Sequence, residues 1–282
     1  MPKEFDTLNE FLLWTPPTRD DDIISGGILV PNTSFVIFGD PKAWKSNTAI
    51  HLSFCLAQGK DWFGHKTRKV LPVYVQIEIP KARFQRRVKK FKAHEDLVFG
   101  TNVLFRTVDD LPLDTTYGEQ QLQGIMSNVR THYPNEEIVL ILDNLLNMVT
   151  GNISQQQDLG RVTRAINVLK KKFNLTVILL HHSRQPVFTI TGDLIDAKGH
   201  ESLGSSWLGG WCDTEMRLQL LDPGGLKSRV RCDFTYSRHA EDYLPSFEVA
   251  WSRQTLHPRV TKIDSIPFDE PEERQISIRG LE

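Results

Sequence analysis

Residues 35–46 constrain the fold of this chain more than any other stretch. A short apolar strand leads into a tight loop that ends in Lys45-Ser46, and a helical pattern follows over residues 47–58. This order matches a P-loop, in which backbone N–H groups and a helix N-terminus surround phosphates. The lysine of such a loop reaches the β- and γ-phosphates, and the serine hydroxyl holds Mg²⁺. The predicted nucleotide-binding residues are Gly39, Asp40, Pro41, Lys42, Ala43, Trp44, Lys45, Ser46 and Asn47.

One position departs from the standard pattern Gly-x-x-x-x-Gly-Lys-Ser/Thr. Trp44 stands where the second glycine is expected. A residue with a Cβ adopts the backbone conformation of that glycine at a cost of roughly 1–3 kcal/mol. The alternative is an ordinary strand–turn–helix with a chance Lys-Ser pair, so the rest of the chain must supply the remaining parts of a nucleotide site.

The composition limits the class of protein. A chain of 282 residues has room for one large α/β domain with short extensions, or for two small domains. A net charge of −1 excludes a uniformly basic nucleic-acid coat but leaves room for a local basic groove. Three widely spaced cysteines indicate ordinary thiols rather than disulfides or zinc ligands. Because the sequence has no signal pattern and no long apolar run, we expect a cytoplasmic protein that does not contact membranes.

Two carboxylates follow buried strands. Glu78 ends the apolar run 70–78, where a general base for water attack would lie. Asp143 follows the five apolar residues 138–142, which is the Walker B pattern of a carboxylate that orients a Mg²⁺ shell. The alternative for each is an exposed carboxylate at the end of an ordinary strand.

A third apolar run, 175–180, ends in His181-His182. Neighbouring side chains on a strand point in opposite directions, so the two histidines do not ligate one metal together. We expect one of them to contact the γ-phosphate or to relay its state. Earlier in the chain, residues 81–92 form a basic helical run, whose common interpretation is a solvated face and whose alternative is contact with phosphate.

The remaining pattern divides the chain into three parts. The pattern of residues 1–25 predicts an amphipathic arm followed by a linker. The arm packs either on its own domain or on a neighbouring subunit. Residues 26–260 form the predicted ATPase domain, with a loop at 147–158, a helix at 159–173 and antiparallel hairpins after residue 215. Residues 261–282 form a polar tail.

The order of these motifs resembles the RecA-like P-loop ATPase core. The resemblance is strongest to compact hexameric replicative helicases of the RepA kind, within the RecA/DnaB superfamily, and covers about residues 23–255. Its most specific pieces are 142–144, 179–183 and 204–206. The resemblance implies an α/β fold, with a mostly parallel central sheet flanked by helices and a C-terminal antiparallel extension.

The resemblance also implies a role for each site residue. Lys45 and Ser46 bind the phosphates and Mg²⁺, and Asp143 holds the Mg²⁺ shell through water. Glu78 activates the attacking water, and His182 or His181 senses the γ-phosphate. Arg238 stands where the superfamily places an arginine finger that acts on the neighbouring subunit's ATP. Related helicases have a lysine two residues earlier, where this chain has Tyr236.

The resemblance implies one main function and leaves two alternatives. The loops 147–158 and 184–203 correspond to those that line a ring's central channel and grip single-stranded DNA, with Arg184, Lys198 and His200 as their obvious cations. The main expectation is an ATP-hydrolysing, ring-forming DNA motor, a small replicative helicase of a plasmid, phage or mobile element. One alternative is a RecA-like regulatory or assembly ATPase that does not translocate DNA. The other is a non-hydrolysing scaffold, for which Trp44 is the main argument.

Overall fold

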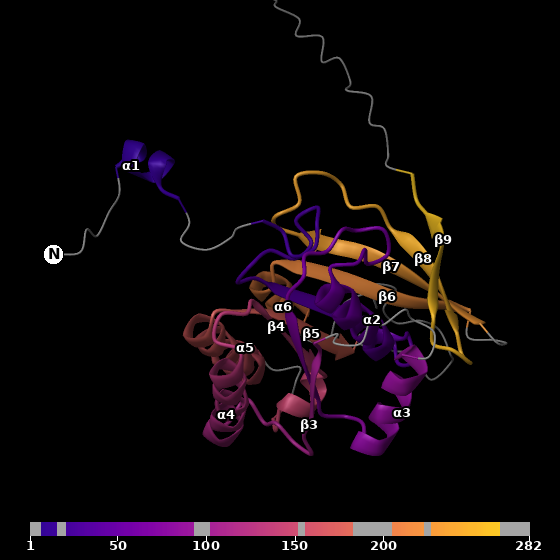
Figure 1. Ribbon diagram of the computed structural model, residues 1–282, viewed down its shortest axis with the longest axis horizontal. Helices are drawn as coiled ribbons and strands as arrows, with labels where there is room; N and C mark the ends of the chain where they lie inside the picture. The colour runs from indigo at the N-terminus through magenta and orange to yellow at the C-terminus, as the bar shows by residue number, and fades with distance from the viewer. Residues whose placement is uncertain are drawn as a thin grey trace, which may run out of the picture.

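A single sheet with helices on both faces organises the protein (Figure 1). The computed structural model describes residues 7–15, 21–92, 102–151, 156–182, 205–222 and 227–265. Over these ranges nine strands lie in the order β3-β2-β4-β5-β1-β6-β7-β8-β9. The strands are β1 (Ser34–Gly39), β2 (Leu71–Gln76), β3 (Leu104–Thr107), β4 (Ile138–Asp143), β5 (Leu175–His182), β6 (Thr214–Asp222), β7 (Lys227–Ser237), β8 (Phe247–Ser252) and β9 (Pro258–Ile263). The helices are α1 (Leu8–Leu13), α2 (Lys45–Gln58), α3 (Lys81–Lys92), α4 (Thr116–His132), η1 (Leu145–Met148), α5 (Gln156–Phe173) and α6 (Ser205–Trp211).

The sheet is parallel from β3 to β6 and antiparallel beyond. The pairs β2–β3, β2–β4, β4–β5, β1–β5 and β1–β6 are all parallel. The pairs β6–β7, β7–β8 and β8–β9 are antiparallel. Every residue of β1, β2 and β4 is buried, as expected for parallel strands covered on both faces. The predicted α/β fold class, with its C-terminal antiparallel extension, is confirmed.

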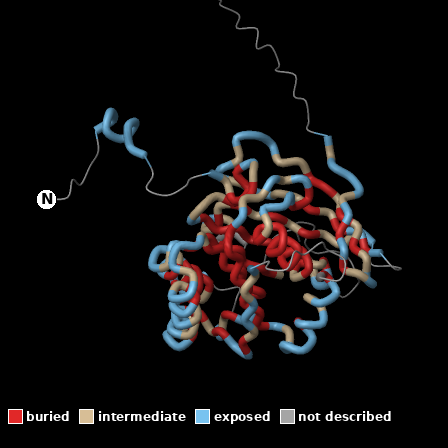
Figure 2. The backbone as a smooth tube through the Cα atoms, in the orientation of Figure 1, coloured by how far each residue is buried: buried red, intermediate tan, exposed pale blue. Residues whose placement is uncertain are grey.

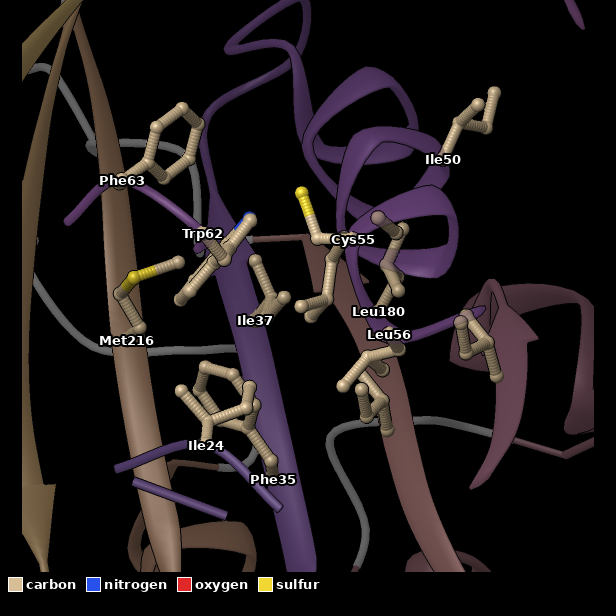
Figure 3. Close-up of a cluster of buried hydrophobic side chains, with 14 of the residues drawn as sticks. Ile24, Phe35, Ile37, Ile50, Cys55, Leu56, Trp62, Phe63, Leu180 and Met216 are labelled. Atoms are coloured by element: carbon tan, nitrogen blue, oxygen red, sulfur yellow. The ribbon is translucent and has the colours of Figure 1, made fainter. Parts of the chain in front are cut away.

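Alternation along the central strands gives two apolar cores, one on each face of the sheet. On β1, Phe35 and Ile37 face the core that contains α2 and α3, shown in part in Figure 3. Val36 and Phe38 face the core that contains α4, α5 and α6. Figure 2 shows these buried residues concentrated along the strands and the inner sides of the helices. The sheet therefore holds the carboxyl ends of its parallel strands along one fixed edge.

The segment 147–158, expected to be a loop, contains more helix than predicted. Asn147 and Met148 belong to the 3-10 helix η1, and α5 begins at Gln156 rather than at Leu159. The first turn of α5 is polar and therefore carries no apolar periodicity. It includes Asp158, an acidic residue that the N-terminal end of the helix dipole favours.

The first described helix, α1, lies apart from the sheet in Figure 1 and has no buried residue. A capping box formed by Thr7 and Glu10 begins it. Its large side chains are exposed, with relative exposures of 65% for Phe11 and 83% for Leu13. Nothing in the described part of the chain covers this apolar surface.

The structure also adds detail near the predicted domain limits. Ile23 and Ile24 are fully buried in the core, and β9 extends to Ile263. Residues 266–282 of the predicted polar tail lie outside the described residues. No helix in the described ranges combines the length and the apolar character needed to cross a membrane.

Candidate active site

The loop between β1 and α2 lies at the carboxyl edge of the sheet. β1 ends at Gly39, where a Cβ would meet the carbonyl oxygen of Leu218 on β6 at 2.1 Å. Only glycine allows this close approach, and β6 thereby fixes the start of the loop. Lys45, the first residue of α2, is buried and donates hydrogen bonds to the carbonyls of Gly39 at 2.8 Å and Asp40 at 2.7 Å. The lysine is thus held over the loop that the sequence predicted to bind phosphate.

Trp44 adopts the left-handed conformation that the standard motif assigns to glycine, with φ of 63° and ψ of 19°. Its ring stacks on Trp251 of β8, with the ring centroids 5.2 Å apart and the planes at 12°. Phe63, from the loop after α2, contacts the same Trp251 ring edge-on, with the ring centroids 6.4 Å apart. An aromatic pair contributes about 0.5–1.5 kcal/mol, which is similar in size to the strain at Trp44.

Asp143 ends β4 and is buried beside the start of α2. Its Oδ2 accepts hydrogen bonds from the Tyr74 hydroxyl at 2.7 Å and from Gln76 Nε2 at 3.0 Å. Burial raises the pKa of Asp143, and hydrogen bonds from Tyr74 and Ser46 act in the opposite direction. Ser46 and Asp143 therefore lie next to each other, as a serine and a Walker B carboxylate must if they are to share a Mg²⁺ ion.

The donor set fits Mg²⁺ rather than a metal bound by protein ligands alone. No group of three or more His, Cys, Asp or Glu residues within the described ranges is placed to hold a metal. Mg²⁺ typically takes one or two protein oxygens together with water and phosphate oxygens. The hydroxyl of Ser46 and the carboxylate of Asp143 supply that small set.

A second polar group lies beside the first. Asn144 Nδ2 donates to Glu78 Oε2 at 2.6 Å and lies 3.3 Å from His182 Nε2. The backbone N–H of Glu78 donates to Gln76 Oε1 at 2.7 Å. Burial and the charge of Lys45 lower the pKa of His182, while Glu78 acts the other way. Asn144 thus links the predicted base to a neutral histidine.

The structure separates the two histidines that the sequence left unresolved. His182 lines the pocket, whereas His181 is fully buried within the sheet. In the β1–β5 register, His182 pairs with Gly39 and His181 with Phe38. His182 is therefore the histidine available to a bound phosphate.

The P-loop and the polar side chains beside it line one cavity of about 480 Å³, a size typical of small-molecule sites. Residues 42–47 of the loop form one wall, together with Glu78, Asp143 and His182. Gly39, Asp40 and Pro41 precede the cavity-lining part of the loop and are not among the lining residues. The opposite wall comes from Leu220, Ser228, Arg253 and Leu256 of the antiparallel extension. The cavity therefore lies between the P-loop and the β6–β9 region.

Four residues near this site were missed by the sequence reasoning: Tyr74, Gln76, Arg87 and Asn144. Tyr74, Gln76 and Asn144 share one sequence signal, which is a polar group within or directly after a buried strand. Gln76, for example, pairs in register with Asp143 on the neighbouring strand β4. Arg87 belongs to the basic run of α3, in which the sequence does not distinguish one cation from another.

Arg238 lies away from the cavity. It follows β7, whose last residue, Ser237, pairs with Thr214, and Thr214 pairs with Phe35 at the start of β1. The arginine therefore lies at the end of the sheet where β1 begins, whereas the P-loop lies where β1 ends. At the usual rise of a strand, the two are about 15–20 Å apart. Its Nη1 donates to Asp213 at 2.9 Å and its Nε to the Tyr236 hydroxyl at 3.1 Å. It cannot reach a phosphate bound in its own subunit.

The predicted DNA contacts Arg184, Lys198 and His200 lie outside the described residues. Their part in DNA binding therefore stays a prediction.

The titration of Lys45 predicts how nucleotide affinity depends on pH. Burial lowers the pKa of Lys45 to about 8 in the free protein, against the opposing effects of Asp143, Asp40 and Glu78. A bound phosphate stabilises the ammonium form, so above pH 8 binding must take up a proton. Mg-ATP is expected to bind about tenfold more weakly at pH 9 than at pH 7, measured by calorimetry. The Lys45→Ala variant should bind weakly with no such slope, and a flat wild-type profile would contradict the assignment.

Comparison with known proteins agrees with this geometry. A family model described as an AAA domain (AAA_25) matches residues 2–186, more than half of the chain. That match includes the P-loop, Glu78, Asp143 and His182 and ends before β6. No curated protein sequence matches the chain.

Among solved structures, one whose title describes it as an ATPase domain matches with a TM-score of 0.55 and 12% sequence identity. The match covers 82% of this chain and 85% of that chain, and at this identity it shows a shared fold. The RecA-like core that the sequence indicated is thereby confirmed. With the family match over residues 2–186, the chain belongs to the AAA domain family and is a P-loop ATPase.

Proposed function

We propose that the protein is an ATP-hydrolysing, ring-forming motor that acts on single-stranded DNA, a small replicative helicase of a plasmid, phage or mobile element. The observation that carries this proposal is that two polar groups lie side by side in one cavity. Ser46 and Asp143 are the pair that would hold Mg²⁺, and Glu78, Asn144 and His182 are the group that would position the attacking water. A protein that only held a nucleotide would not need a positioned base.

The proposed chemistry assigns each residue one task. Lys45 leaves the carbonyls of Gly39 and Asp40 and binds the β- and γ-phosphates. Glu78 accepts the proton of a water whose oxygen attacks the γ-phosphorus, and the bond to the β-phosphate oxygen breaks. Asn144 keeps the Glu78 carboxylate oriented and connects it to His182. When bound, Mg²⁺ would neutralise charge on the phosphate oxygens.

Assembly of several copies follows from two features. Arg238 lies at the edge of the sheet opposite its own P-loop, so a contribution to catalysis requires the ATP of an adjacent copy. Tyr236, which stands where related helicases have a lysine, positions Arg238 through its hydroxyl and lies under the guanidinium, whose centre is 5.9 Å from the ring centroid. The exposed apolar surface of α1 supplies an arm that we assign to a neighbouring subunit of the same ring.

DNA binding rests on the resemblance rather than on described contacts. Arg184, Lys198 and His200 belong to the sequence between β5 and α6, outside the described residues. In a ring, these cations would meet the phosphate backbone of a single strand in the central channel.

The deciding experiment is ATP turnover with and without a single-stranded oligonucleotide, together with the mass of the assembled protein. A motor is expected to hydrolyse ATP several-fold faster with DNA, and its DNA affinity should fall steeply with salt, with a log–log slope of about −0.7 per phosphate contacted. Lys45→Ala is the control and should remove hydrolysis without unfolding the domain.

Other outcomes identify the alternatives. Hydrolysis that a saturating oligonucleotide leaves unchanged, without DNA binding at low salt, would contradict the motor and favour a regulatory ATPase. The absence of any heat on titration with Mg-ATP would contradict ATP hydrolysis altogether and favour a scaffold.

A further inference from the structure

The basic helix α3 contains one cation whose environment differs from that of the others. Seven of the twelve residues of α3 are Lys or Arg, and none is acidic. Phe84 and Phe91 are buried in the core on one side of the helix. Arg83, Arg86, Lys89 and Lys90 are exposed, whereas Arg87 is only partly exposed. Arg87 lies where the buried side of the helix meets the exposed side.

Arg87 lines the nucleotide cavity together with Lys45, Ser46, Glu78 and Asp143. Its guanidinium is near enough to Asp143 and Tyr74 to interact electrostatically with both. The Tyr74 hydroxyl donates a hydrogen bond to Asp143. The guanidinium is thus close to the carboxylate that would orient the Mg²⁺ shell of a bound nucleotide.

The hydrogen-bonding capacity of Arg87 is not used by any residue that the structure describes. Within the described ranges, neither a hydrogen bond nor an ion pair joins its guanidinium to another residue. The Oδ2 of Asp143 already accepts from Tyr74 and Gln76, which leaves less capacity for Arg87 on that carboxylate. A planar group with five N–H donors at the wall of a cavity is well suited to a phosphate, which accepts two parallel hydrogen bonds from an arginine.

We propose that Arg87 binds the γ-phosphate of ATP from the same subunit and makes the site distinguish ATP from ADP. This proposal rests on the proposed function and deepens it. Lys45 approaches the phosphates from the loop, and Arg87 approaches from α3, beside Glu78. Because α3 begins three residues after Glu78, the contact also ties the helix that follows the base to the phosphate that the water attacks. Arg87 therefore acts in cis, in contrast to Arg238.

The experiment compares Arg87→Ala with Arg86→Ala, which removes the same charge from an exposed position on the same helix. Affinities for ADP and for a non-hydrolysable ATP analogue are measured by calorimetry, and kcat is measured at saturating Mg-ATP. Loss of one charge-assisted contact is expected to weaken analogue binding by roughly ten- to one hundred-fold in Arg87→Ala and to leave ADP binding unchanged. The kcat of that variant should fall by at least about tenfold, and Arg86→Ala should match the wild type.

Arg87→Gln is a second variant that keeps most of the side chain for packing, and thermal unfolding reports whether each variant folds. Equal losses of analogue and ADP affinity, or no loss of either, would overturn the proposal. A selective loss that appears in Arg86→Ala as well would also overturn it, because the effect would then be general electrostatics. The ratio of analogue to ADP affinity tests Arg87 even if the wild-type protein fails to hydrolyse ATP, so the two proposals fail separately.

Discussion

Arg238→Ala is expected to lower ATP turnover of the assembled protein by roughly 10³–10⁵-fold while leaving Mg-ATP binding intact. An arginine supplied by a neighbouring subunit stabilises charge that develops on the transferred phosphoryl group, and this range is its usual effect on kcat. The side chain is at the edge of the sheet opposite its own cavity, so its removal does not disturb the bound nucleotide. Steady-state turnover and calorimetric titration with Mg-ATP measure the two quantities separately.

A mixing experiment distinguishes action in trans from a structural effect. Arg238→Ala carries an intact Lys45, and Lys45→Ala carries an intact Arg238, so each variant supplies what the other lacks. In randomly mixed rings at equal concentrations, about a quarter of the interfaces combine both intact groups and should recover activity.

Arg259→Ala, at an exposed position on β9, is the control for loss of a surface arginine. If the mixture stays inactive although mixed rings form, or if Arg238→Ala binds no Mg-ATP, the trans assignment is wrong.

Glu78→Gln is expected to reduce hydrolysis by roughly 10²–10⁴-fold, the range associated with loss of a general base. The amide oxygen of glutamine still accepts the hydrogen bond from Asn144, so the variant should fold and bind Mg-ATP as the wild type does. Single-turnover hydrolysis with the protein in excess isolates the chemical step from product release.

Glu119→Gln, at an exposed position on α4, provides a matched control for loss of one carboxylate. Turnover of Glu78→Gln within a few-fold of the wild type would place the base elsewhere in the site.

Much of the site could be predicted from the sequence because its main residues end apolar runs. Asp143 and His182 end buried strands, Lys45 and Glu78 come shortly after such strands, and parallel strands bring their carboxyl ends to one edge. Local periodicity is therefore enough to place them together. The same reasoning identified the antiparallel hairpins, whose strands alternate between apolar and polar residues.

The remaining features depend on contacts between distant parts of the chain. The link from Asn144 to Glu78 and His182 joins three strand ends, and no local pattern records it. Arg87 and Arg86 are separated by about 100° about the axis of α3, and that rotation decides which of the two cations faces the cavity and which faces the solvent. Such differences appear only when the sheet and its helices have been assembled.

The stack of Trp44 on Trp251 gives the nucleotide pocket an optical signal of its own. Indole emission depends on contact with other rings and on exposure to solvent, and Trp44 lines the cavity while Trp251 is buried beneath it. A movement of the P-loop that separates the two rings would change the intensity and wavelength of tryptophan fluorescence. Nucleotide binding that separates the rings would therefore be detected through the residue that departs from the standard motif, by tryptophan fluorescence and without an added dye.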